Sequence, residues 1–150
     1  MKKMFLILVA VVWCVSALGQ GAGVVTRSSR YSVAETMDRA EAAVKAANGF
    51  QIFARVDFQS LAAAQGGNVR PSQLLVFGRG TVLQPLLPQY PVTALDLPLK
   101  ILAWEDDGGK VMISYNTGEY LAQRHGINGK DDVLKRLTEA TALFANGAGE

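Results

Sequence analysis

The segment from Leu95 to His125 constrains the fold more than any other part of the chain. It reads LDLPLKILAWEDDGGKVMISYNTGEYLAQRH, with two apolar runs at 99–104 and 111–115. Between the runs stands Asp106-Asp107-Gly108-Gly109-Lys110, which is rich in turn-forming residues. Two strands joined by so short a connection predict an antiparallel β-hairpin. A short helix is expected to follow over 119–125.

Two amphipathic helices are predicted on either side of the strand-rich middle of the chain. Ser32 followed three residues later by Glu35 is a capping box, and a stripe of apolar side chains continues over 32–48 until Gly49. A second helix with one apolar stripe is predicted over 130–145 and is expected to end at Asn146-Gly147. Each stripe must be buried against another layer of structure.

Further strands are predicted at 24–30, 50–58 and 73–77, with a helical turn at 61–65 and a short helix around 82–87. The resulting order is β, α, β, β, an irregular segment, a β-hairpin and α. It predicts an α+β protein, a two-layer sandwich in which two main helices cover one face of an antiparallel sheet of about five strands. No repeat or linker divides the chain, so 20–150 is expected to form a single domain.

The first nineteen residues resemble a secretory signal peptide. Lys2 and Lys3 are followed by an almost unbroken apolar run over 4–15, and Ser16-Ala17-Leu18-Gly19 supplies small residues for cleavage. The alternative is a retained membrane anchor, since the run from Met4 to Gly19 is only slightly short of the roughly 20 residues that span a bilayer. No basic stop-transfer cluster follows it. We therefore expect cleavage after Gly19 and a periplasmic or secreted protein.

Cleavage would change the charge and the cysteine content of the chain. The full sequence has 15 Lys and Arg against 13 Asp and Glu, and loss of Lys2 and Lys3 leaves 13 of each sign. The single cysteine, Cys14, would leave with the signal, which excludes disulfides and thiol chemistry in the mature chain. A balanced charge argues against nucleic acid or an anionic membrane as a partner.

Side chains that could carry chemistry gather in the same segment, 95–125. The candidate ligand-binding residues are Lys100, Trp104, Glu105, Tyr115 and His125. His125 is the only histidine of the chain, so no transition-metal site and no cofactor are predicted. Because Gly126 follows it, His125 has the alternative role of hydrogen-bonding the free carbonyls at a helix end.

Lys100 and Trp104 share one face of their predicted strand, and the sequence does not decide which face the helices cover. On the covered face Lys100 would be desolvated, with a lowered pKa and nucleophilic potential. On an open face its stem would lie along the indole of Trp104. Glu105 ends the strand and is not explained as a turn former, whereas Tyr115 could line a pocket or belong to the core.

Five blocks of sequence follow one another in a distinctive order. They are RPSQLLVFG at 70–78, ALDLPLK at 94–100, AWED with GKV at 103–106 and 109–111, SYN at 114–116, and YLA with RH at 120–122 and 124–125. Together they resemble the domain of unknown function 302 family. The resemblance runs over about 32–127 and implies a two-layer α+β fold, often a homodimer, without an assigned activity. Members often have Asp-His where this chain has Asp57-Phe58, and Asn-Pro where it has Arg79-Gly80. The missing histidine argues against a two-histidine metal site.

Three functional hypotheses follow. The first is an exported domain that binds a small ligand or a partner near Lys100, Trp104, Glu105, Tyr115 and His125. The second is a hydrolase- or isomerase-type enzyme that uses Lys100 or His125 with a carboxylate, which requires these groups to converge. The third is a structural homodimeric envelope protein, which predicts an exposed apolar sheet face.

Overall fold

The computed structural model describes residues 23–150 of the chain. Its strands are β1 (Val24–Ser28), β2 (Gln51–Asp57), β3 (Ser72–Gly78), β4 (Leu99–Glu105) and β5 (Val111–Asn116). Its helices are α1 (Val33–Ala46), α2 (Phe58–Ala63), α3 (Gly80–Leu83), the 3-10 helix η1 (Pro91–Leu95), α4 (Gly118–His125) and α5 (Asp131–Gly149). The predicted signal peptide, 1–19, lies outside the described residues.

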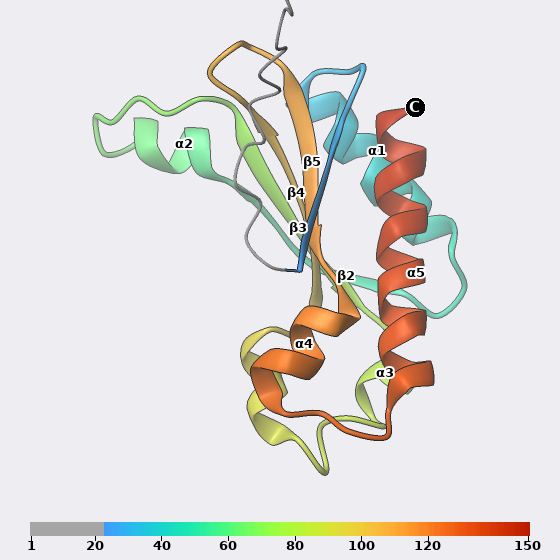
Figure 1. Ribbon diagram of the computed structural model, residues 1–150. Helices are drawn as coiled ribbons and strands as arrows, with labels where there is room; N and C mark the ends of the chain where they lie inside the picture. The colour runs from blue at the N-terminus through green and yellow to red at the C-terminus, as the bar shows by residue number, and fades with distance from the viewer. Residues whose placement is uncertain (1–22) are drawn as a thin grey trace, which may run out of the picture.

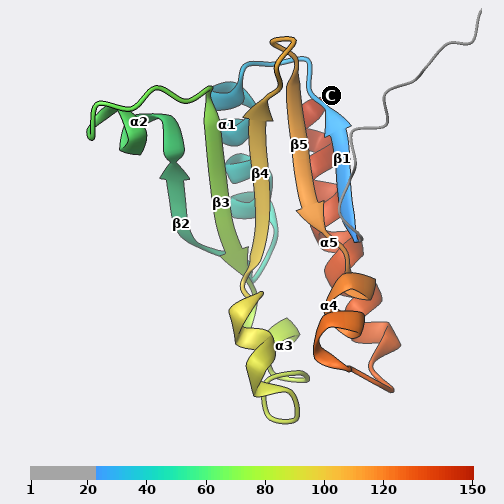
Figure 2. The same cartoon turned by 60° about the vertical axis from the view of Figure 1, so that its left-hand side comes forward.

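The five strands form one antiparallel sheet in the order β1-β5-β4-β3-β2 (Figure 2). The β4–β5 hairpin is present as predicted, and its turn is held by Asp106, whose Oδ1 accepts hydrogen bonds from the amides of Gly108 and Lys110 at 2.9 and 2.8 Å. Gly109 has φ 78°, a left-handed conformation that favours glycine. The two-layer α+β prediction is confirmed.

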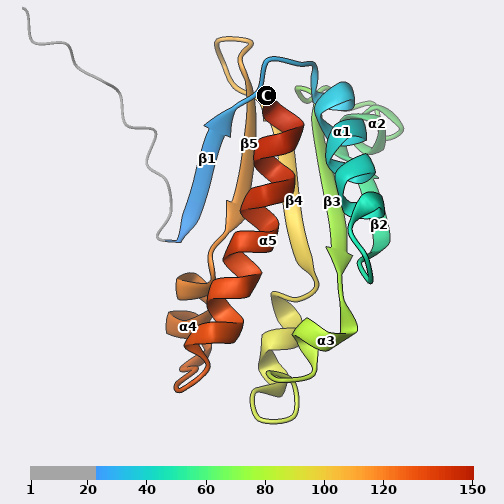
Figure 3. The same ribbon diagram turned by 90° about the vertical axis from the view of Figure 1, so that its right-hand side faces the viewer.

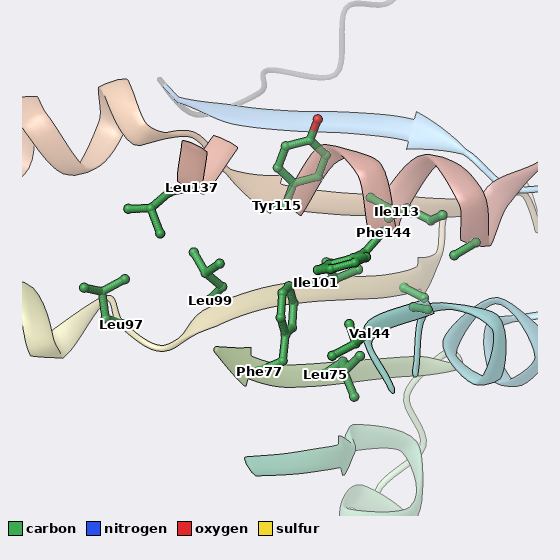
Figure 4. Close-up of a cluster of buried hydrophobic side chains, with 14 of the residues drawn as sticks. Val44, Leu75, Phe77, Leu97, Leu99, Ile101, Ile113, Tyr115, Leu137 and Phe144 are labelled. Carbon is green, nitrogen blue, oxygen red and sulfur yellow. The ribbon is translucent and has the colours of Figure 1, made fainter. Parts of the chain in front are cut away.

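Helices α1 and α5 pack side by side on one face of the sheet, and the hydrophobic core lies between them and β3, β4 and β5 (Figures 1 and 3). Figure 4 shows this layer. The fully buried side chains include Met37, Leu75, Phe77, Ile101, Ile113 and Leu137. Phe77 and Phe144 meet edge to face with ring centroids 5.5 Å apart, a favoured geometry for aromatic pairs.

The start of α1 follows its local sequence signal, whereas the end of α5 does not. Ser32 caps α1 as predicted, because its hydroxyl accepts a hydrogen bond from the amide of Glu35 at 3.2 Å. The predicted end of the second helix at Asn146-Gly147 was wrong, since α5 runs on to Gly149. Ala148 is fully buried, and packing of this last turn against the sheet outweighs the low helix propensity of Gly147.

A β-bulge in β2 changes which side chains face the core. Ile52 pairs with Phe77, but Ala54 pairs with Val76, so Phe53 is the extra residue. The simple alternation predicted over 50–58 therefore breaks at Phe53. Ala54 and the next alternating side chain, Val56, point to the face away from the helices.

The chain between β3 and β4 lies at one end of the sheet. The helix predicted around 82–87 is shorter and earlier than expected, because α3 covers only Gly80–Leu83 and Pro85 follows. The 3-10 helix η1, which the sequence did not predict, leads into β4 and contacts α4. This end of the sheet is the lower end in Figure 2, and the hairpin turn is at the upper end.

Candidate functional site

The five predicted site residues fall in three separate places. Lys100 and His125 lie at the lower end of the sheet, where η1, β4 and α4 meet. Trp104 and Glu105 lie at the hairpin end of β4. Tyr115 is only 5% exposed and belongs to the core, on the side of the sheet that the helices cover (Figure 4). The structure thus brings Lys100 and His125 together but does not join all five in one pocket.

Lys100 and His125 converge on Asp96, a residue that sequence reasoning did not select. The Asp96 carboxylate oxygen Oδ2 forms an ion pair with Arg124 Nε at 2.9 Å and shares a hydrogen bond with His125 Nε2 at 2.5 Å. Lys100 Nζ donates to the Asp96 main-chain carbonyl at 2.8 Å and to the Pro98 carbonyl at 3.0 Å. We call Asp96, Lys100, Arg124 and His125 the Asp96 cluster.

Local structure places the members of the Asp96 cluster. Asp96 ends η1, and α4 begins at the N-cap Thr117, whose hydroxyl accepts from the Tyr120 amide. Gly126 ends α4 with φ 61°, so the last turn presents both Arg124 and His125 to η1. The His125 side chain is 5% exposed and is tied to Asp96, not to the free helix carbonyls that the sequence suggested as its alternative.

Burial and the nearby negative charge shift the pKa of Lys100 in opposite directions. Partial desolvation lowers the pKa of the Lys100 ammonium below the ordinary 10.5, and the negative charge of Asp96 partly offsets this. Lys100 is on the sheet face that the helices leave open, because it pairs with Val76 and alternates with the buried Ile101. Its amine folds back onto the loop before β4 instead of extending into water.

The face of the sheet opposite α1 and α5 is apolar over its middle. We call it the open face, and its partly exposed apolar side chains are Ala54, Val56, Leu74, Val76, Leu102, Trp104 and Met112. Phe53, 53% exposed, joins them, since its ring would touch a Cβ at Gly78. The solvent face of an antiparallel sheet is ordinarily polar, so a run of apolar side chains is unusual for such a face.

Polar groups border the open face on the β1 side. Trp104 Nε1 donates to Ser114 Oγ at 2.9 Å, and Ser114 Oγ is 2.8 Å from Thr26 Oγ1. The indole nitrogen is thereby satisfied within the sheet. Trp104 therefore keeps its apolar ring on the open face without leaving its indole donor unpaired.

Comparison with known proteins places these features in a family context. The family model "Domain of unknown function DUF302" matches residues 25–144. The crystal structure of an uncharacterised conserved protein DUF302 from Bacillus stearothermophilus aligns with a TM-score of 0.75 at 15% identity, covering 85% of this chain and 99% of that chain. At this identity the match reports the shared fold.

Curated relatives add a different kind of similarity. "Fluoride-specific ion channel FluC 1" of Brucella suis is 42% identical over 130 residues, which cover 84% of this chain and 50% of that protein. "Fluoride-specific ion channel FluC 2" of Brucella melitensis matches equally well over 47% of its length. The chain spans about half the length of these relatives. Within residues 23–150, none of the helices has the length and apolar character needed to cross a bilayer.

Proposed function

Since the chain belongs to the DUF302 family, a family of unknown function, we propose that it is an exported binding domain whose open face takes a second copy of the chain. The observation that carries the proposal is the apolar composition of the open face. Leu74, Leu102 and Met112 are partly exposed to water on this face. Burial of their apolar surface against a partner would lower the free energy of the protein. The signal-like residues 1–19 support export.

The size of the open face suits a small homodimer. Five strands about 4.8 Å apart and about six residues long, at about 3.4 Å per residue, cover roughly 500 Å². Two such faces bury about 1,000 Å² in total, near the lower limit for a specific interface. Helix α2 stands out on the same side of the sheet (Figure 1), and its exposed Phe58 and Leu61 can enlarge the contact.

The strand order also suits a two-fold interface. β4 is the central strand, so Leu102 in its middle lies near the centre of the open face. A two-fold axis through this point would pack Leu102 against its own copy, with the polar Thr26 and Ser114 at the rim. Apolar centres with polar rims are the common anatomy of such interfaces.

Sedimentation velocity over a concentration series tests the proposal. We expect a dimer for residues 20–150 that Leu102→Lys and Phe53→Lys convert to monomer. The matched control is Leu143→Lys, because Leu143 is 68% exposed on α5, on the other side of the molecule. A wild-type monomer at all concentrations would remove the second copy as the partner. If only Leu143→Lys abolished the dimer, the dimer interface would lie on the helices and not on the open face.

The relatives support a second candidate function, an accessory role in fluoride handling. The observation that favours it is the 42% identity to one half of proteins named as fluoride-specific ion channels. Deletion of the gene from its host should then lower the fluoride concentration that stops growth, and the gene supplied in trans should restore it. Unchanged tolerance of fluoride, with tolerance of chloride as the reference, would contradict this role.

The enzyme hypothesis remains a separate proposal with one supporting observation. It required Lys100 or His125 to converge with a carboxylate, and His125 Nε2 contacts the Asp96 carboxylate, whereas Lys100 contacts only the Asp96 main-chain carbonyl. A substrate-screening assay in which Lys100→Met and His125→Gln abolish a turnover that Lys135→Met retains would support it. Turnover that is unchanged by both substitutions would contradict the enzyme hypothesis.

A further inference from the structure

A pocket of about 210 Å³ lies at the hairpin end of the molecule, on the side of the sheet that the helices cover. The residues that matter for its chemistry are Ser32, Asp57, Gln73 and Glu105, which come from the start of α1 and from β2, β3 and β4. The pocket is separate from the Asp96 cluster, which lies at the other end of β4. It is also on the other side of the sheet from the open face.

The register of the strands explains why this pocket is polar. Asp57 pairs with Gln73 and Gln73 pairs with the buried Ala103, so these side chains point to the covered side. Glu105 is two residues beyond Ala103 and points the same way. Here the core ends and α1 begins, so three adjacent strands place polar side chains under the first turn of a helix.

The Asp57 carboxylate is held in its charged form. Its Oδ1 accepts a hydrogen bond from the Ser60 amide at 3.0 Å, and Oδ2 accepts from Gln73 Nε2 at 3.1 Å. The Ser60 amide is the main reason that the pKa of Asp57 is below 3.8. Each carboxylate oxygen can accept a second hydrogen bond, so Asp57 retains capacity for a ligand.

Glu105 supplies a second negative charge with a loose partner. Its Oε1 lies 3.7 Å from a terminal nitrogen of Arg70, beyond hydrogen-bond distance, and the Arg70 side chain is 49% exposed. An exposed ion pair of this length contributes little to stability. A ligand cation can therefore replace Arg70 at Glu105 with little loss to the fold.

The spacing of Asp57 and Glu105 on one face of the sheet favours a ligand with two cationic ends. Asp57 and Glu105 are two strands apart and offset by two residues, which puts their Cα atoms about 12 Å apart. Within residues 23–150, no three His, Cys, Asp or Glu side chains are placed so that they could hold a metal ion together. A four-carbon diamine is about 6 Å long, and two N–H···O contacts of about 2.8 Å bring its reach to about 12 Å.

We propose that this pocket binds a small organic diamine, with one ammonium group on Asp57 and the other on Glu105. The pocket volume of about 210 Å³ is smaller than the roughly 300–1,000 Å³ that is typical of pockets for drug-sized ligands. Gln73 lies between the two acids in the sheet, and its amide is fixed there, because its Nε2 donates to Asp57 and its Oε1 accepts from Arg55. The proposal does not rest on dimerisation, because the open face takes no part in it.

NMR titration of ¹⁵N-labelled protein with 1,4-diaminobutane tests the site. We expect saturable shifts of the Ala34, Gln73 and Val111 amides, all at the pocket, and weaker binding of 1-aminobutane. Asp57→Asn and Glu105→Gln should each weaken binding at least tenfold, whereas Glu139→Gln on α5 should not. Asparagine caps a helix as well as aspartate, so Asp57→Asn is expected to keep α2 folded.

Two further measurements make the result decisive. Arg70→Ala should tighten diamine binding, because it removes the cation that competes for Glu105. The open-face variant Leu102→Lys should bind the diamine as the wild type does. Shifts that never saturate, or that persist unchanged in Glu105→Gln, would overturn the proposal and leave only unspecific attraction of a cation to acidic side chains.

Discussion

Replacement of Gly118 by alanine should destabilise the domain at the contact that positions the Asp96 cluster. Gly118 opens α4, and an added Cβ would lie 2.3 Å from the Leu134 carbonyl oxygen and 2.7 Å from its carbon, both in the backbone of α5. Because neither is a flexible side chain, α4 must move away from α5. Overpacking of this kind costs about 1–3 kcal/mol.

The shift would also weaken a specific hydrogen bond. The Gly118 amide donates to Thr138 Oγ1 at 2.7 Å, and its loss adds about 1 kcal/mol. Alanine favours the helix over glycine by about 1 kcal/mol in a helix interior, and at the first helical position the substitution gains only part of this stabilisation. We therefore expect Gly118→Ala to lower the free energy of unfolding by about 2–3 kcal/mol and the melting temperature by about 10 °C.

Urea and thermal unfolding followed by circular dichroism measure this effect. The matched control is Gly147→Ala in α5, where an added Cβ meets nothing within 4 Å. The same substitution should there stabilise the protein by about 0.5 kcal/mol, because alanine is the better helix former. Equal stability of Gly118→Ala and the wild type would refute the close packing of α4 on α5 described above.

Three further predictions concern the cluster, acid stability and export. Asp96→Ala should lower the free energy of unfolding by about 2 kcal/mol through loss of its ion pair with Arg124 and its hydrogen bond to the buried His125. The exposed Lys135→Ala should change it by less than about 0.5 kcal/mol, and urea unfolding distinguishes these outcomes. The lowered pKa of Asp57 stabilises the fold above pH 3.8, and this contribution is lost as the pH falls through the folded-state pKa. Asp57→Asn should accordingly show a shallower loss of stability below about pH 4 in acid titrations, and an unchanged slope would contradict the assignment. Mass spectrometry of the protein from its host should find Gln20 as the first residue, and an intact Met1 would contradict cleavage.

The fold was accessible from the sequence wherever local signals agreed with the tertiary structure. Ser32 and Gly49 bracket α1, and the Asp-Gly turn at 106–109 fixes the hairpin, because both depend on hydrogen bonds between near neighbours. The last turn of α5 and the bulge at Phe53 depend on packing against distant strands. No local pattern encodes such contacts, so the sequence prediction missed them.

The candidate site shows the same limit more strongly. His125 was selected as the only histidine, but its partner Asp96 stands 29 residues earlier in the chain. The one local signal was an acid in the family-like block ALDLPLK, and it gave no reason to pair the two residues. The alternation that groups Lys100 with Trp104 was correct, yet about 13 Å of strand separates their Cα atoms. Lys100 and Trp104 therefore lie on the same face of β4 but do not belong to the same site.

Isotope-filtered NOE spectroscopy tests the central claim, that the open face binds a second copy, most directly. The sample would mix methyl-labelled and unlabelled protein, so that only contacts between two copies are observed. We predict intermolecular NOEs from the methyl groups of Leu74, Leu102 and Met112 on the open face. Intermolecular NOEs from Leu143 on α5, or no intermolecular NOEs at millimolar protein, would contradict the account.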